Sequence, residues 1–339
     1  MKNRNIKISV LLLTAACVIV CALHMTSCMP SYPKEKLPEM IKEIFRIEYK
    51  MDVDVAIEGG TLGIYHPMEG LLDVNMSIST EAWDQISNLI LVASRVVLST
   101  DADIKFYCVI AQDVRLPELQ VVIIKYVDDV KHGMYRSIGR DESFKRTLFN
   151  INLTPQAKKE RSVESIFDKL GLEEDVRESV LKEFFRSPPT KISDIGFWRG
   201  TFFLKEIMLP EFLAEQISNR IKLDFREEQT LGSTFSFQSS EGYFEKDVTN
   251  ENFFDIRFKI FDKVIPIKSI EAREEKIEKI LTIVNAVVDG YKFFEFDHVE
   301  IQDQIVDAKL VVSKENIINF NSKSTSLKDV VETSKPYFG

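Results

Sequence analysis

"EAWDQISNLILVASRVV" (81–97) and "EAREEKIEKILTIVNAV" (271–287) follow one pattern, and this repeated pattern decides the fold that we expect. Around these segments, residues 81–122 align without a gap to residues 271–312, at a constant offset of 190 and with eleven identities in 42 positions. Average residue usage would give about two or three identities. This self-similarity predicts two copies of one structural unit, with chance similarity between amphipathic segments as the alternative.

Shorter matches extend the repeat beyond the gapless region. They are "LPEMIKE" (37–43) with "LPEFLAE" (209–215), "TLG" (61–63) with "TLG" (230–232), and "EGLLD" (69–73) with "EGYFE" (241–245). We therefore place the first copy at residues 37–128 and the second at residues 209–320.

Each copy has the pattern helix, strand, strand, helix, strand, strand. The first copy has its strands at 53–57, 62–66, 103–112 and 119–127, with the first two forming a hairpin around Gly59-Gly60. The second copy has them at 221–225, 233–237, 293–302 and 308–313, with "FFDIRFKIF" (253–261) as an additional half-buried strand. Helices on one face of an antiparallel sheet would bury the apolar stripes, so we expect an α+β fold of two tandem modules.

A mostly helical connector is expected between the copies, at residues 129–208. Within it, residues 162–171 and 173–185 have the pattern of an αα-hairpin, with Gly171 as the stop of the first helix. Val176 and Val180 belong to one apolar stripe, so this hairpin should dock on a module as a spacer or bind a partner. Residues 321–339 are expected to form a C-terminal tail.

The first 27 residues have the pattern of a signal peptide. A cationic start, "MKNRNIK", precedes an apolar run of sixteen residues (8–23). As a helix this run would span roughly 24 Å, which is short of the roughly 30 Å hydrocarbon core of a bilayer. Cleavage after residue 27 is therefore the leading interpretation, and an uncleaved N-terminal anchor is the alternative.

The segment His24-Met25-Thr26-Ser27-Cys28 resembles the lipobox of bacterial lipoproteins, with Met25 where that family prefers leucine. The resemblance implies that Cys28 is acylated and becomes the new N-terminus, and that residues 28–36 are a short tether. Because Met29 is not the aspartate that retains such proteins in the inner membrane, it also implies residence in the outer membrane facing the periplasm. In a bacterium with one membrane, the protein would lie on the outer face of the cytoplasmic membrane.

The charge of the chain limits its partners. The net charge is −9, and without residues 1–27, which carry three basic residues and no acid, it is 41 − 53 = −12. This balance disfavours nucleic acid as a partner, and it disfavours adhesion to anionic lipid through a basic face.

Sequence motifs for catalysis, metal binding and cofactor binding are absent from the chain, so we expect no catalytic, metal or cofactor site. His66, His132 and His298 are too far apart in sequence to indicate a metal cluster, and Cys108 lies in an apolar row typical of a core. The leading hypothesis is a non-enzymatic envelope lipoprotein that binds or scaffolds an envelope protein. The alternatives are an envelope hydrolase with a carboxylate site between the modules and a lipoprotein that binds a small ligand.

Overall fold

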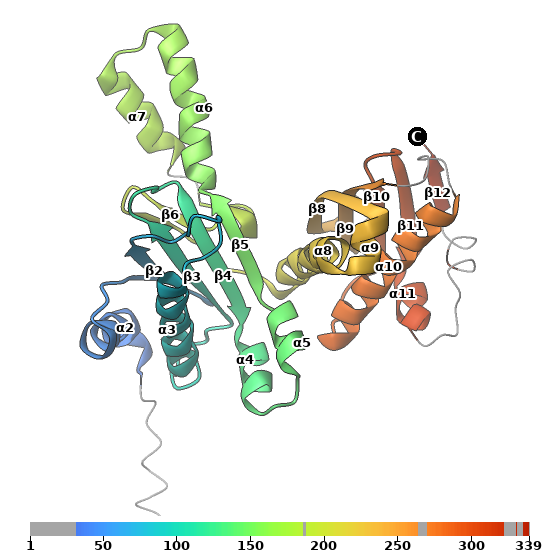
Figure 1. The fold of residues 1–339 in the computed structure, drawn as a ribbon, viewed down its shortest axis with the longest axis horizontal. Coiled ribbons are helices and arrows are strands. Elements are labelled where there is room, and N and C mark those ends of the chain that lie inside the picture. Colours follow the sequence, from blue (N-terminus) through green and yellow to red (C-terminus); the bar gives the residue numbers. More distant parts are fainter. Residues whose placement is uncertain (1–31, 186–187, 264–269, 322–329, 331–334, 339) are drawn as a thin grey trace, which may run out of the picture.

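The computed structural model describes residues 32–185, 188–263 and 270–321, together with residues 330 and 335–338. Its helices and strands form two tandem α+β modules, each built on a five-stranded sheet, which confirms the predicted fold class (Figure 1). Sheet 1 contains β1 (Asp54–Glu58), β2 (Thr61–Met68), β3 (Phe106–Asp113), β4 (Leu119–Tyr126) and β5 (Leu148–Leu153). Sheet 2 contains β8 (Phe235–Lys246), β9 (Asn252–Asp262), β10 (His298–Asp303), β11 (Ala308–Ser313) and β12 (Lys335–Phe338).

The helices precede, connect and follow the strands. Module 1 has α2 (Leu37–Ile44), which continues as a π-helical turn (Phe45–Tyr49), and α3 (Thr80–Val97). Module 2 has α8 (Leu209–Glu227), α9 (Gln229–Thr234), α10 (Ile270–Gly290) and α11 (Lys314–Asn321). Between β4 and α8 lie α4 (Val127–Met134), α5 (Arg140–Lys145), α6 (Pro155–Leu170), α7 (Glu174–Phe184) and the hairpin of β6 (Gly196–Trp198) and β7 (Thr201–Phe203).

The two sheets share one topology, including one parallel pair in each. Phe106 lies opposite Thr61, and His298 lies opposite Phe253, so the parallel partners are separated by the same number of residues (106 − 61 = 45 and 298 − 253 = 45). Our expectation of purely antiparallel sheets is wrong at these two pairs. The reason is that α3 and α10 carry the chain back across the sheet, and such a crossover makes the strands that it joins parallel.

One identical pair of the repeat, Asp113 and Asp303, keeps its role in both modules, whereas Leu91 is exposed and its counterpart Leu281 is buried. Asp113 and Asp303 end equivalent strands, and each carboxylate accepts a hydrogen bond from the backbone amide two residues further on, at 2.8 and 3.0 Å. The equivalence shifts by one residue in the next strand, because Ile110 pairs with Val122 whereas Glu300 pairs with Val311. The turn between the two strands is therefore one residue shorter in module 2.

The start of module 2 differs from our expectation. Residues 221–225, predicted as a strand, belong to α8, in which Ile217, Ile221 and Phe225 are buried along one helical face. The hairpin is instead β8–β9, so the strand that we expected to be additional is the counterpart of β2. A short apolar run is compatible with both the helical and the strand period. Here the apolar pattern of α8 continues through residue 225, and a pattern of this length is typical of a helix.

Both predicted modules end too early, and each leaves out the last strand of its sheet. β5 lies beyond residue 128, in the segment that we predicted as a mostly helical connector. It pairs with β4 and therefore belongs to sheet 1. β12 lies in the predicted tail and pairs with β11. A strand with polar residues on one side carries little hydrophobic signal, and the unpaired edge of the neighbouring strand determines where it binds.

The expected tether is partly held against module 1. Tyr32 forms an isolated parallel bridge with Thr100, and the Lys34 amide donates to Asp101 Oδ1 at 2.7 Å. Lys34–Lys36 then form a 3-10 turn that leads into α2. Cys28, with the rest of residues 1–31, lies outside the described residues.

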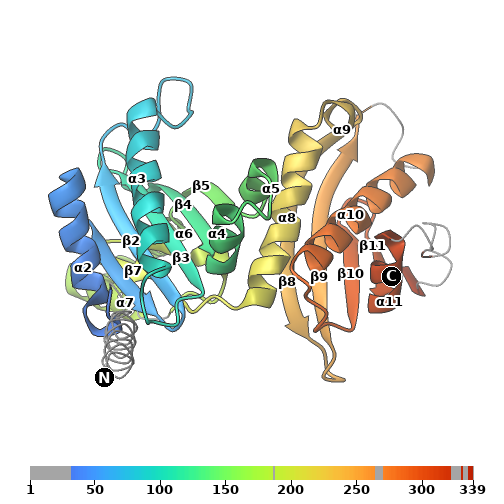
Figure 2. The same ribbon diagram turned by 90° about the horizontal axis from the view of Figure 1, so that it is seen from below.

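Sheet 1 is covered on both faces, not on one as expected. On one face α2 and α3 pack against alternate β3 residues such as Tyr107 and Val109. On the other face, Phe106, Cys108 and Ile110 join a core that includes the β6–β7 hairpin and α8. Figure 2 shows α8 lying between the two sheets.

The contact between α8 and β8 predicts that Gly242→Ala destabilises the protein. An added Cβ at Gly242 would lie 2.1 Å from the Ala214 carbonyl oxygen on α8, so the strand and helix must separate. Such overpacking, with the backbone shift that it forces, costs about 1 to 3 kcal/mol. Urea unfolding measures the loss, and Gly139→Ala is the matched control, because nothing lies within 4 Å of its added Cβ. Equal midpoints for Gly242→Ala and the wild type would contradict this packing.

Candidate functional site

The histidines and the cysteine singled out in the sequence occupy separate structural positions. His66 is hydrogen-bonded at both ring nitrogens, to the Asp52 carbonyl oxygen and to Gln85. His132 is exposed on α4, and His298 stacks on Phe253 in sheet 2. Burial raises the pKa of the Cys108 thiol, as expected for a core residue. Among the described residues, no group of three or more His, Cys, Asp or Glu side chains is placed to hold a metal ion.

Three carboxylates, those of Glu211, Glu215 and Glu245, line a cavity beside α8, where the connector meets module 2. Glu211 and Glu215 on α8 line this cavity of about 190 Å³ with Lys191 and Tyr243. Both Glu211 oxygens lie 2.8 Å from Lys205 Nζ. No sequence motif marks this group, although Glu215 ends the repeated "LPEFLAE" segment.

Glu215 is the unusual member of this group. Burial first, and then the nearby charge of Glu241, raise its pKa to about 7. A carboxyl group with such a pKa can act as a proton donor near neutral pH. This is therefore where the hydrolase hypothesis would place its acid, although the cavity lies between the connector and module 2 and not between the two sheets.

The raised pKa of Glu215 predicts a pH-dependent stability. Its folded-state pKa lies above the ordinary value, so the folded protein is favoured while the group is protonated, and that advantage is lost as pH rises from about 4.5 to 7 and above. Glu215→Gln keeps the shape and removes the titration. It should be more stable than the wild type at pH 8, by about 1 to 3 kcal/mol, and close to it at pH 4.5. Urea unfolding at both pH values tests this, and an equal difference at both would refute it.

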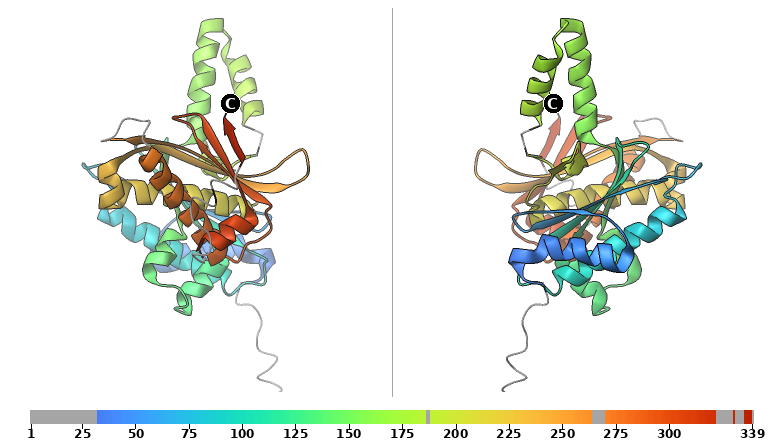
Figure 3. Two further views of the ribbon diagram at one scale, coloured as in Figure 1. Left: turned by 90° about the vertical axis from the view of Figure 1, so that its right-hand side faces the viewer. Right: turned by 90° about the vertical axis from the view of Figure 1, so that its left-hand side faces the viewer.

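The helices α6 and α7 form an arm that projects from the body of the molecule (Figures 1 and 3). This confirms the predicted αα-hairpin, and Gly171 ends α6 with a φ of 62°. Arg177 joins the two helices, because its guanidinium donates to the Leu172 carbonyl oxygen at 2.8 Å and to Asp168 at 2.6 Å. At the base, Trp198 Nε1 donates to Glu160 at 2.6 Å.

Apolar side chains of the arm are uncovered. Ile166 is 52% exposed and Leu170 is 66% exposed, and Val176 and Val180 are also exposed. The prediction that the Val176 and Val180 stripe docks on a module is therefore wrong, because the arm points away from both sheets. The distal part of the arm is acidic: residues 162–183 contain three basic and seven acidic residues, so their net charge is 3 − 7 = −4, whereas the whole arm, residues 155–184, has a net charge of 6 − 8 = −2.

The arm and the beginning of the described chain lie at opposite ends of sheet 1. Tyr32 is beside Thr100, at the end of the sheet where α3 finishes and β3 begins. β5 starts at that end, runs antiparallel to β4 and leads at its far end into α6. Figure 1 shows α2 and α4 toward one end and the arm at the other.

Comparison with known proteins identifies no relative: no protein-family model, curated protein or solved structure matches the chain. No helix in the described part of the chain combines the length and the apolar character needed to cross a membrane.

Proposed function

We propose that this chain is a lipid-anchored protein of the bacterial cell envelope that binds or scaffolds another envelope protein and catalyses no reaction. The observation that supports it is the placement of Tyr32 and the arm at opposite ends of sheet 1. Tyr32 lies four positions after Cys28, and an extended chain covers about 3.5 Å per residue, so an acyl chain on Cys28 would hold Tyr32 within about 14 Å of the bilayer surface. The arm would then point away from the membrane.

The arm is the surface that we assign to the partner. Uncovered apolar side chains on a projecting element indicate an interaction site. The net charge of −4 in its distal part favours a basic partner, and an amphipathic helix could cover the exposed apolar residues of α6 and α7. We therefore propose that the partner is a basic, amphipathic segment of another envelope protein. The arm would meet it in the periplasm if the bacterium has two membranes, and outside the cytoplasmic membrane if it has one.

Acylation is tested by labelling cells with radioactive palmitate. The wild type should incorporate label, and Cys28→Ser should incorporate none, because no thiol would remain at the lipobox position. Stable attachment needs more than one acyl chain, so the mature protein should also resist extraction by high salt and alkali. Label of equal intensity on Cys28→Ser, or residues 1–27 retained in the mature wild type, would remove the lipid assignment.

Partner binding is tested with Leu170→Asp and Val180→Asp, which place a charge on the apolar surface of the arm. Affinity purification from detergent-solubilised membranes should recover at least tenfold less of any protein that co-purifies with the wild type. Val248→Asp is the matched control, because Val248 is fully exposed on the β8–β9 turn, far from the arm in sequence and fold. The arm carries no binding role if all three variants recover the same amount of partner while their thermal unfolding is unchanged.

A further inference from the structure

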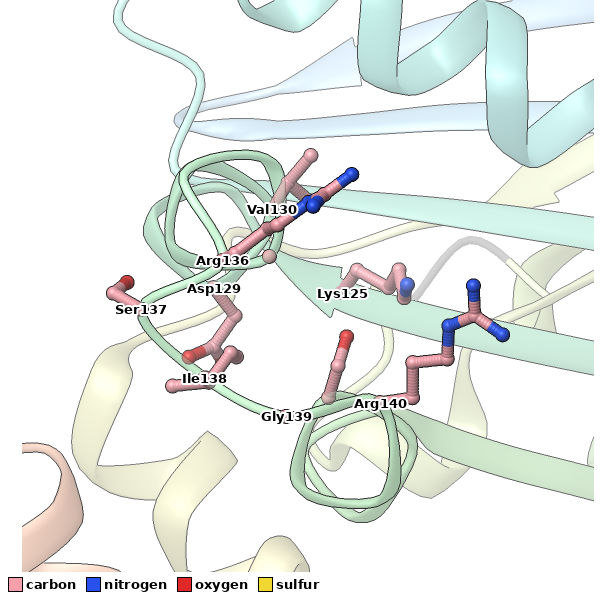
Figure 4. Close-up of a pocket in the computed structure, with 10 residues that line it drawn as sticks. Lys125, Asp129, Val130, Arg136, Ser137, Ile138, Gly139 and Arg140 are labelled. Carbon is pink, nitrogen blue, oxygen red and sulfur yellow. The ribbon is translucent and has the colours of Figure 1, made fainter.

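Three basic side chains from different elements line one cavity of about 740 Å³ in module 1. Figure 4 shows Lys125 on β4, Arg136 in the loop after α4, and Arg140 at the start of α5 around this cavity. We propose that this cavity binds the phosphate group of an anionic ligand.

No acidic side chain of the described chain forms an ion pair with these three cations. Within the described residues, the side chains of Lys125, Arg136 and Arg140 make no hydrogen bond and no ion pair, whereas the adjacent Lys131 pairs with Asp128 at 2.7 Å. Arg136 and Arg140 are exposed and Lys125 is half-buried, so the three side chains form a locally basic cavity in a chain with a net charge of −9. The missing partner is then supplied by a ligand.

The one acid in the cavity wall does not neutralise the cluster. One oxygen of Asp129 accepts from Arg146 at 2.9 Å and the other accepts from Tyr291. Its charge is therefore already compensated by Arg146. Burial lowers the pKa of Lys125, and the nearby charge of Asp129 partly opposes this effect although the two side chains form no ion pair.

The remaining lining suits a phosphorylated molecule. Guanidinium groups bind phosphate through parallel N–H bonds, and a lysine adds a point charge. Val130 and Ile138 add apolar wall, and Ser143 contributes a hydroxyl. The volume lies in the range of roughly 300 to 1,000 Å³ that is usual for small-molecule sites.

Two sources of phosphate fit this chemistry. Val127, which follows β4, donates its amide to the Lys105 carbonyl oxygen at the start of β3, so the cavity lies at the same end of sheet 1 as Tyr32. If the proposed anchor at Cys28 is correct, this end faces the bilayer and the phosphate is that of a lipid headgroup. Otherwise the ligand is a soluble phosphate compound. The phosphate site itself does not depend on the anchor.

The test measures how fast an amine-reactive reagent modifies Lys125 in the full chain, followed by mass spectrometry. In neutral detergent, pyrophosphate should slow modification of Lys125 at least tenfold and leave Lys131 unaffected. In phosphatidylcholine nanodiscs, adding phosphatidylglycerol should give the same protection if the headgroup is the ligand. Protection by pyrophosphate alone assigns a soluble ligand to the same site.

The double variant Arg136→Gln, Arg140→Gln should lose this protection, or need at least tenfold more anion for it. Arg115→Gln is the control, because Arg115 is an exposed arginine that pairs with Glu69 outside the cavity. The proposal is overturned if no anion slows the modification of Lys125, or if anions slow it equally in the wild type and the double variant. The detergent measurement needs no membrane, so its failure is distinct from failure of the lipid assignment.

Discussion

Burial of α8 between two sheets is the interaction on which the rest of the structure depends. The Phe212 ring lies 5.1 Å from the Phe106 ring of sheet 1, and the helix backbone at Ala214 lies against Gly242 of sheet 2. A helix that is apolar on several faces must be covered on several faces. Burying a side chain such as Phe212 contributes about 2 to 3 kcal/mol. The two modules therefore share one continuous core, which fixes the base from which the arm projects.

A buried polar network supports the same contact. Arg146 of module 1 donates to Asp129 and to the Gly290 carbonyl oxygen of module 2, and Arg220 of α8 donates to Glu142. A buried charge without a partner is costly, so another arrangement of the modules that broke this network would be strongly destabilised. The intact network itself adds little to the free energy of unfolding. It also engages both oxygens of Asp129, so this carboxylate forms no ion pair with the basic residues of the neighbouring cavity. The packing of the modules thus determines the chemistry of the cavity.

The two surfaces that we assign to ligands differ in how they are built. The arm is stiffened by the Arg177 contacts at its turn and is anchored at its base by Trp198, so its apolar residues are presented without support from either sheet. The cavity is formed where β4, α4 and α5 meet, beside the module interface. Because they lie at opposite ends of sheet 1, a single molecule can engage a phosphate group and a protein partner at the same time.

Local sequence pattern was sufficient to predict several features of the fold. These are the two modules, the long helices α3 and α10, the β3–β4 and β10–β11 pairs, and the arm with its helix stop at Gly171. Each of these depends on periodicity or on a turn residue within a few positions. The parallel pairs, the continuation of α8 through 225, the pairing of β5 and β12, and the exposure of Val176 and Val180 were decided only by the tertiary structure. The same holds for Glu215 and for the group of Lys125, Arg136 and Arg140. Periodicity identifies which side of an element is apolar, but what covers that side, and which charges are left unpaired, depends on segments distant in sequence.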